Sequence, residues 1–224
     1  MTLASAVQLA PEASDELRKS ISAPRFRTYE GATATARDAL LLYAWNARAS
    51  AAFYVSLQGL EVTLRNAFHR EMGAKFGEDW LTASRSSLLA EQRRLVDEAL
   101  TQLQKLGRGQ GPDDVVAALS LGFWLSLLTK SYETLWRQAL YRVFSNAKAV
   151  TGRGLNRPDA LDKLNHIRVL RNRIAHHEPI FQRHLEADAK SISDVIRWMS
   201  PETADWYSSI SDLSAVLVER PARG

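Results

Sequence analysis

Cysteine is absent from the 224-residue sequence, so the fold does not depend on disulfide bonds. Zinc sites built from cysteine thiolates are excluded for the same reason. The sequence also lacks an uninterrupted apolar run of about 20 residues, the length that a helix needs to cross a bilayer. Its N-terminus, MTLASAVQLAPEASDELRKS, has no basic segment followed by a long apolar run and does not resemble a signal peptide. We therefore expect a soluble cytoplasmic protein without a membrane partner.

Signals for β-strands are scarce. The sequence contains no Asn-Gly or Asp-Gly pair and no clear run of alternating β-branched residues. Apolar residues recur instead at spacings of three and four, which is typical of amphipathic helices. Hydrophobic residues make up 46% of the chain and charged residues 24%, enough apolar material for a core. These features predict an all-α fold, a helical bundle with no substantial β-sheet.

Positive charge is only slightly in excess of negative charge. The formal net charge is +4 and the sequence pI is about 9.5. Such a balance permits a polyanionic partner but does not require one, because many proteins with this charge never bind nucleic acid. Charge alone therefore does not decide the function.

The pattern divides the chain into three parts. Residues 1–30 are expected to be a loose lead-in with a short helix near 14–21, and Pro24 should break whatever precedes it. Residues 31–219 are expected to form a single helical domain, and residues 220–224 a flexible tail.

Glycine and proline mark the expected boundaries within the helical domain. The pattern predicts helices over 33–72, 86–106, 187–199 and 201–218, a helix from Pro158 to Pro179, loops at 107–112 and 145–157, and an aromatic core segment between Gly122 and Phe144.

One segment, HIRVLRNRIAHHEPI at 166–180, is rich in arginine and histidine. On an ideal helix its apolar side chains centre about 300° from Arg171, which places Arg171 on the border of the core face. Asn172 and His176 then lie at about 100° and 140°, on roughly the opposite side. These two side chains are expected to point away from their own bundle, where a substrate or a second chain could meet them.

Arginine and histidine together suit the cleavage of RNA. The guanidinium of Arg171 offers permanently charged, planar donors that match phosphate oxygens. The imidazole of His176 can gain or lose a proton near neutral pH. RNA cleavage needs both, because the 2′-hydroxyl loses a proton, the 5′-oxygen gains one, and the phosphate needs positive charge. No metal ion or other cofactor is required when the 2′-hydroxyl is the nucleophile.

The motif Arg171-Asn172-x-x-x-His176 resembles the R-x(4–6)-H motif of HEPN-domain ribonucleases. Other segments resemble the Abi-like (abortive infection D/F type) family in the expected order. They are LYAWNARASAAFYVSLQGLEVTLRNAF at 42–68, GFW at 122–124, YETLW at 132–136 and HHEP at 176–179. The resemblance spans roughly residues 22–185.

The resemblance implies a HEPN-like helical bundle with additional helices, which forms a homodimer with a composite active site. It also implies an endoribonuclease toxin of a phage-defence (antiviral) or toxin–antitoxin system, which leaves a 2′,3′-cyclic phosphate and a 5′-hydroxyl. Arg171 and His176 become the catalytic pair by this resemblance, and Asn172 the supporting polar residue. Some relatives are restrained by a partner, so an RNA or protein antitoxin is a further expectation.

A second Arg-Asn pair precedes a histidine on the long helix, in the segment Glu61-Val-Thr-Leu-Arg65-Asn66-Ala-Phe-His69. Residue type suggests that Glu61 or Arg65 pairs with Arg171 or contacts RNA. Within the family pattern this segment recurs on the long helix, so we expect it near the C-terminal motif.

The residues beside the motif have both functional and structural interpretations. His177 and Arg173 could contact RNA, but His177 could equally cap the helix and Arg173 could pair with Glu178. A metal site built from His176, His177 and Glu178 is disfavoured, because adjacent helical side chains diverge by about 100° and no supporting ligand motif is present.

Other features favour structural interpretations. The aromatic residues Phe123, Trp124, Tyr132 and Trp136 could stack on bases, but their apolar neighbours favour the core. A phosphate backbone could be bound by Arg93–Arg94 and by the cluster at 105–108. The simpler interpretation is that both are solvent-exposed surface. The GRGQG segment lacks the Lys-Ser/Thr ending of a phosphate-binding loop.

Two rival functions remain open beside the nuclease. The same basic helix end could bind RNA without cutting it, or the chain could be a protein-interaction module of a larger defence complex. For Arg171 and His176 the structural alternative is an exposed helix end whose cations stabilise the helix dipole.

Overall fold

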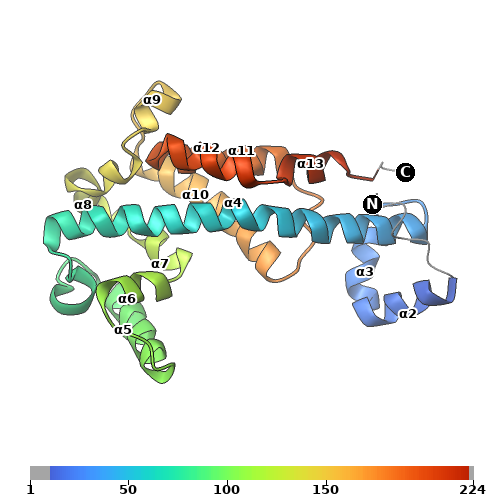
Figure 1. The fold of residues 1–224 in the computed structure, drawn as a ribbon, viewed down its shortest axis with the longest axis horizontal. Coiled ribbons are helices and arrows are strands. Elements are labelled where there is room, and N and C mark those ends of the chain that lie inside the picture. The colour runs from blue at the N-terminus through green and yellow to red at the C-terminus, as the bar shows by residue number, and fades with distance from the viewer. Residues whose placement is uncertain (1–10, 222–224) are drawn as a thin grey trace.

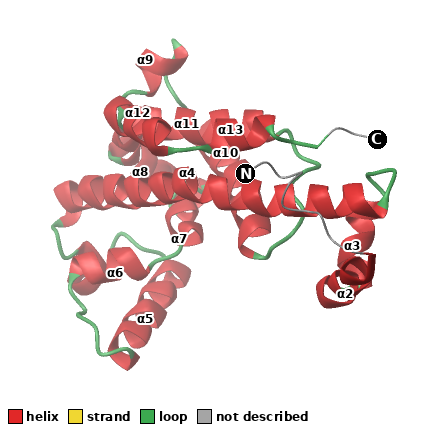
Figure 2. Ribbon diagram, turned by 45° about the vertical axis from the view of Figure 1, so that its right-hand side comes forward, coloured by secondary structure: helices red, strands yellow, loops and turns green. Residues whose placement is uncertain are grey.

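In the computed structural model, the described residues 11–221 form helices, turns and loops, with no strand among them (Figure 2). The predicted all-α class is confirmed. No helix in this part of the chain has both the length and the apolar character needed to cross a membrane.

The molecule is built along one helix, α4 (Ala36–Phe76), which runs the length of the ribbon (Figure 1). Its 41 residues correspond to about 60 Å at 1.5 Å per residue. The helix begins at Thr35, whose side chain accepts a hydrogen bond from the backbone N–H of Asp38. It ends at Gly77, which has a φ of 94°, a backbone conformation that glycine adopts readily. The predicted helix end at residue 72 is too early, and Gly73 lies inside the helix.

The other elements contact α4 or pack on one another beside it. They are α2 (Pro11–Ile21), α3 (Ala23–Glu30), the π-helix Trp80–Ser84, α5 (Ala90–Lys105), α6 (Pro112–Ala118), α7 (Leu121–Ser126), the 3-10 helix Lys130–Tyr132, α8 (Glu133–Gln138), the 3-10 helix Leu140–Phe144, α9 (Ala147–Thr151), α10 (Arg157–Ala175), α11 (Leu185–Met199), α12 (Pro201–Ile210) and α13 (Leu213–Val218).

Two groups of helices lie on different sides of α4. Helices α11, α12 and α13 cover one side, α5, α6 and α7 lie on the other, and α10 crosses from the first group to emerge beyond α4 (Figure 1). Helix α12 approaches α4 closely at Gly59, where an added Cβ would lie 2.7 Å from the ring of Tyr207. A glycine at this crossing is therefore a packing requirement.

The aromatic side chains of the segment between α6 and α9 are buried as predicted, except Tyr141, which is 48% exposed. Phe123, Trp124, Tyr132 and Trp136 all belong to one hydrophobic core cluster that also contains the apolar face of α4. Trp124 packs against Phe123 with ring centroids 5.0 Å apart. These rings are occupied in the core, so they are not available to stack on bases.

The expectation of a loose lead-in over residues 1–30 is wrong for residues 23–30. Ser22, with φ of 76°, separates α2 from α3, and Pro24 lies in the first turn of α3. Phe26 and Tyr29 are buried in the core cluster, so α3 is a packed element. Residues 1–10 lie outside the described residues.

Two other boundaries also differ from expectation. The predicted loop at 145–157 contains α9, whose Ala147 is buried. The tail is attached at its start, because Arg220 Nη2 donates to the carbonyl of Phe181 at 2.8 Å and stacks over Trp45. Residues 222–224, the rest of the expected flexible tail, lie outside the described residues.

Candidate functional site

Helix α10 carries the Arg-His segment, and its start follows the prediction. Asn156 is the N-cap, accepting a hydrogen bond from the backbone N–H of Asp159 at 2.8 Å. Pro158 lies in the first turn, where its missing N–H costs nothing. The apolar face is buried through Leu164, Ile167 and Leu170, so the helix is fixed in rotation about its axis.

The helix ends at Ala175, before the expected stop at Pro179. His176 is the C-cap, and His177 adopts the left-handed conformation with φ of 56°. The N–H of His177 donates to the carbonyl of Ile174, and the N–H of Glu178 donates to that of Arg173 at 2.8 Å. This pair of bonds is a Schellman motif with histidine in the position that usually holds glycine. The motif explains the early stop, because it satisfies the last carbonyls.

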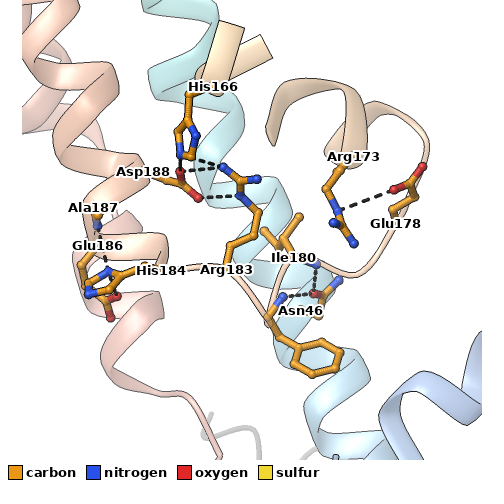
Figure 3. A network of polar contacts seen from close by, with 11 residues as sticks. Asn46, His166, Arg173, Glu178, Ile180, Arg183, His184, Glu186, Ala187 and Asp188 are labelled. Carbon is orange, nitrogen blue, oxygen red and sulfur yellow. Dashed lines mark hydrogen bonds and ion pairs between the residues drawn. The ribbon is translucent and has the colours of Figure 1, made fainter. Parts of the chain in front are cut away.

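The segment after the histidines is held against α4 by a side chain that the sequence analysis missed. Asn46 Oδ1 accepts from the backbone N–H groups of Ile180 and Phe181, at 2.8 Å and 3.1 Å (Figure 3). Asn46 is only 6% exposed. Its signal was present in the sequence, because Asn46 stands on the same helical stripe as Leu42 and Ala49, and a buried amide needs partners.

A second polar cluster fixes the far end of this segment. Arg183 donates from Nε and Nη2 to the two carboxylate oxygens of Asp188, at 2.7 Å and 2.8 Å. His166 Nε2 lies 2.9 Å from Asp188 Oδ1, so the cluster joins α10, the loop and α11 (Figure 3). The Asp188 side chain is nearly inaccessible, and the bidentate arginine compensates its burial.

Arg171 contacts α4 through Glu61, one of the two residues that the sequence suggested as a partner. Its Nε donates to Glu61 Oε1 at 2.9 Å. The Arg171 side chain is 40% exposed, which agrees with a position on the border of the core face. Its terminal nitrogens have no hydrogen-bond partner among the described residues. The guanidinium is thus oriented by one edge and free on the other.

Arg171 lines a hollow of about 400 Å³ between α4 and the end of α10, here termed the arginine hollow. Its lining consists of Tyr54, Leu57, Gln58, Glu61, Val62, Arg65, Arg171, Ile174 and Ala175. Two guanidinium groups and one carboxylate therefore meet at an otherwise largely apolar surface.

A larger hollow of about 860 Å³ lies on the other side of the α10 end, here termed the tyrosine hollow. Its lining consists of Arg25, Tyr29, Tyr43, Asn46, Ala47, Ser50, Ala51, Tyr54, Ile174, Ala175 and His177. Tyr54, Ile174 and Ala175 line both hollows, so the two are neighbours along α4. Arg25 Nη1 donates to the carbonyl of His177 at 3.3 Å, which links α3 to the end of α10.

The structure does not bring all three predicted catalytic side chains together within one chain. His176 is exposed and lines neither hollow, and Asn172 is half-buried and also lies outside both linings. Only Arg171 belongs to the arginine hollow.

Of the predicted supporting residues, some line the arginine hollow and others make only local contacts. Arg65 lines the arginine hollow and donates from Nη1 to the carbonyl of Ala117 at 3.4 Å, while its buried Nε has no partner. Arg173 lies 3.6 Å from Glu178, the local pairing considered from the sequence. His69 accepts a hydrogen bond from the buried Trp80 Nε1 at 2.9 Å and does not line the arginine hollow.

The remaining sequence candidates show no link to this site. Arg94 pairs with Glu91 and Glu98 on the exposed face of α5, while Arg93 and Arg108 are solvent-exposed. Among residues 11–221, no group of three or more histidine, aspartate or glutamate side chains is arranged to hold a metal ion.

Comparison with known proteins gives no assignment. The chain matches no protein-family model, no curated protein and no solved structure.

Proposed function

We propose that the chain is an endoribonuclease that cleaves RNA without a metal ion, with Arg171 and His176 as its catalytic pair. The observation that carries this proposal is the geometry of Arg171. Glu61 holds its Nε, and the terminal nitrogens stay available at the rim of the arginine hollow. A guanidinium oriented in this way is suited to a phosphate whose charge grows in the transition state.

The proposed reaction is attack of the 2′-hydroxyl on the adjacent phosphorus. The bond from the 2′-oxygen to phosphorus forms while the bond from phosphorus to the 5′-oxygen breaks. His176 handles the protons, one leaving the 2′-hydroxyl and one arriving on the 5′-oxygen. Asn172 orients one of the reacting groups. The products carry a 2′,3′-cyclic phosphate and a 5′-hydroxyl.

We further propose that two copies of the chain build the site together. His176 lies outside the arginine hollow of its own chain, so a second α10 end would have to supply the missing imidazole. A homodimer would place the partner's His176 at the phosphate held by Arg171, where its imidazole takes the proton from the 2′-hydroxyl and delivers one to the 5′-oxygen. The resemblance to Abi-like proteins supports a cytoplasmic defence or toxin–antitoxin setting, with an RNA or protein antitoxin as restraint.

The separation of His176 from Arg171 favours a second candidate function, a non-catalytic module that binds RNA or another protein of a defence complex. The two candidates respond differently to solution conditions. Cleavage that depends on histidine varies between about pH 5 and 8, whereas phosphate binding mainly follows salt concentration.

The test is RNA cleavage in the presence of EDTA by the native chain, Arg171→Ala and His176→Ala. Matched controls are Arg137→Ala, an exposed arginine that lines neither hollow, and His184→Asn, which keeps a side chain able to cap the start of α11. Folding of each variant is first checked by circular dichroism. We expect cyclic phosphate products from the native chain and both controls, and none from the two site variants. Folded native chain that cuts neither total cellular RNA nor tRNA would refute the nuclease and leave the binding module.

A further inference from the structure

The two hollows lie along one face of α4. Tyr43, Ser50, Tyr54, Glu61 and Arg65 are spaced by seven, four, seven and four residues, which keeps them on one helical stripe. From Tyr43 to Arg65 this stripe is about 33 Å long at 1.5 Å per residue. We call the tyrosine and arginine hollows together the α4 groove, with the end of α10 at its middle.

Positive charge is distributed along the groove. Arg25 lies at the tyrosine hollow, and Arg171 and Arg65 lie at the arginine hollow. Glu61 is the one carboxylate in the two linings, and Arg171 already uses it. An anionic chain that follows the groove would thus meet guanidinium groups at both hollows, with little opposing charge.

Tyr54 is the most unusual side chain of the groove. It is 68% exposed on a helix whose other aromatic rings are buried or half-buried, and it borders both hollows. Tyr43 and the buried Tyr29 lie in the same hollow, in edge contact with their centroids 5.1 Å apart. Exposed aromatic rings beside arginines are the usual means of holding single-stranded nucleic acid, because bases stack on the rings.

We propose that the α4 groove binds single-stranded RNA, with an unpaired base stacked on Tyr54 and seated in the tyrosine hollow. The volume of about 860 Å³ falls in the range of small-ligand pockets, so it has room for a base. A base that is paired and stacked in a duplex cannot enter. The phosphates on either side of the seated base then lie toward Arg25 and Arg171. This inference rests on the proposed function for the identity of the ligand, RNA.

The test measures binding without cleavage. The probe is a fluorescein-labelled hexanucleotide of 2′-O-methyl RNA, which lacks the hydroxyl that the proposed reaction needs. Fluorescence anisotropy at fixed salt compares the native chain with Tyr54→Ala and Tyr54→Phe. The matched control is Tyr141→Ala, because Tyr141 is also exposed but lines neither hollow. The same strand annealed to its complement tests the preference for unpaired bases.

We expect Tyr54→Ala to weaken hexamer binding about tenfold, since stacking contributes roughly 1–3 kcal/mol per base. Tyr54→Phe and Tyr141→Ala should bind like the native chain, and the duplex should bind more weakly. Equal binding by Tyr54→Ala would overturn the proposal, and so would native chain that fails to bind the hexamer. If Tyr54→Ala instead converts a dimer into a monomer by light scattering, the Tyr54 ring packs on the partner subunit instead of on a base, and the proposal is wrong.

These results are separable from the proposed function. Native chain that binds the hexamer through Tyr54 but cuts no RNA would support the groove and refute the nuclease. Native chain that cuts RNA while Tyr54→Ala binds the hexamer unchanged would refute the groove and leave the nuclease standing.

Discussion

Glu61 and Arg171, 110 positions apart in the sequence, form a hydrogen-bonded ion pair between α4 and the end of α10. The bond occupies only one nitrogen of the guanidinium. The partly exposed pair contributes little to stability, about 1 kcal/mol or less, because water screens it. Its consequence is orientation, since it fixes which edge of Arg171 faces the arginine hollow.

We therefore expect Glu61→Gln to leave the thermal midpoint nearly unchanged and to reduce RNA cleavage by about tenfold, the cost of roughly 1.4 kcal/mol in transition-state stabilisation. The matched control is Glu219→Gln, which removes the charge from a similarly exposed pair with Arg48. Cleavage at the native rate by Glu61→Gln would show that the charge of Glu61 is not needed to orient Arg171, because the amide oxygen of glutamine can still accept from its Nε.

Asn46→Ala should destabilise the fold by about 2–4 kcal/mol. The substitution leaves the backbone N–H groups of Ile180 and Phe181 without an acceptor, and each unsatisfied buried donor costs roughly 1–3 kcal/mol. Urea unfolding measures the change. Asn66→Ala, on an exposed position of the same helix, is the control and should change stability by less than about 0.5 kcal/mol. A loss no larger than the control's would mean that water replaces the amide.

Asp188→Ala should lower the free energy of unfolding by about 3–5 kcal/mol, since it strands the largely buried guanidinium of Arg183. His166→Ala should cost less than about 1 kcal/mol, because its imidazole is mostly exposed. The double variant Asp188→Ala/Arg183→Met should recover part of the loss. Additive losses in the double variant would contradict the pairing.

Gly59→Ala should destabilise the protein by about 1–3 kcal/mol through overpacking, although alanine favours helix by about 1 kcal/mol over glycine. The added methyl would lie 2.7 Å from the Tyr207 ring. Gly73→Ala in the same helix is the control, because its nearest new neighbour would be 3.8 Å away, and it should be neutral or stabilising. Tyr207→Ala should make Gly59→Ala tolerable, and a double-mutant cycle without coupling would count against this contact.

Stability should fall at high pH through Tyr29. Burial first, and then the neighbouring Tyr43, raise the pKa of Tyr29 from 10.0 to about 12. The folded state binds the phenol proton of Tyr29 more tightly than the unfolded state does. The resulting contribution to the free energy of unfolding is complete below pH 10 and is lost as pH rises from 10 through 12. Thermal midpoints of native chain and Tyr29→Phe between pH 9 and 12 should show a shallower decline for the variant. Tyr141→Phe, at an exposed tyrosine, should decline like the native chain.

Much of the fold and part of the site followed from sequence periodicity. The long helix, the aromatic core and the start of α10 were predictable, because burial imposes regular spacing and proline marks a first turn. The meeting of Glu61 with Arg171 was anticipated as one of several pairings. Whether Arg171 contacts Glu61 or Arg65 depends on how α4 packs relative to α10. Residue spacing along each helix does not determine that packing.

Other features depend on contacts between distant residues. The end of α10 was placed too late because histidine, not glycine, occupies the left-handed position, and the usual stop signal was missing. The packing of α3 follows from Phe26 and Tyr29, which are too few to give a clear helical period. The partners of Asn46 lie far along the chain, so the buried amide alone could not identify them.

The left-handed backbone at His177 gives natural variation at this position a specific meaning. Glycine satisfies that conformation at the lowest cost, asparagine and aspartate tolerate it, and β-branched residues do not. If only the backbone mattered, homologous chains would drift to glycine here. Conservation of histidine at this position would therefore indicate that the imidazole itself is needed. Valine or isoleucine would instead indicate that α10 of that chain ends at a different residue.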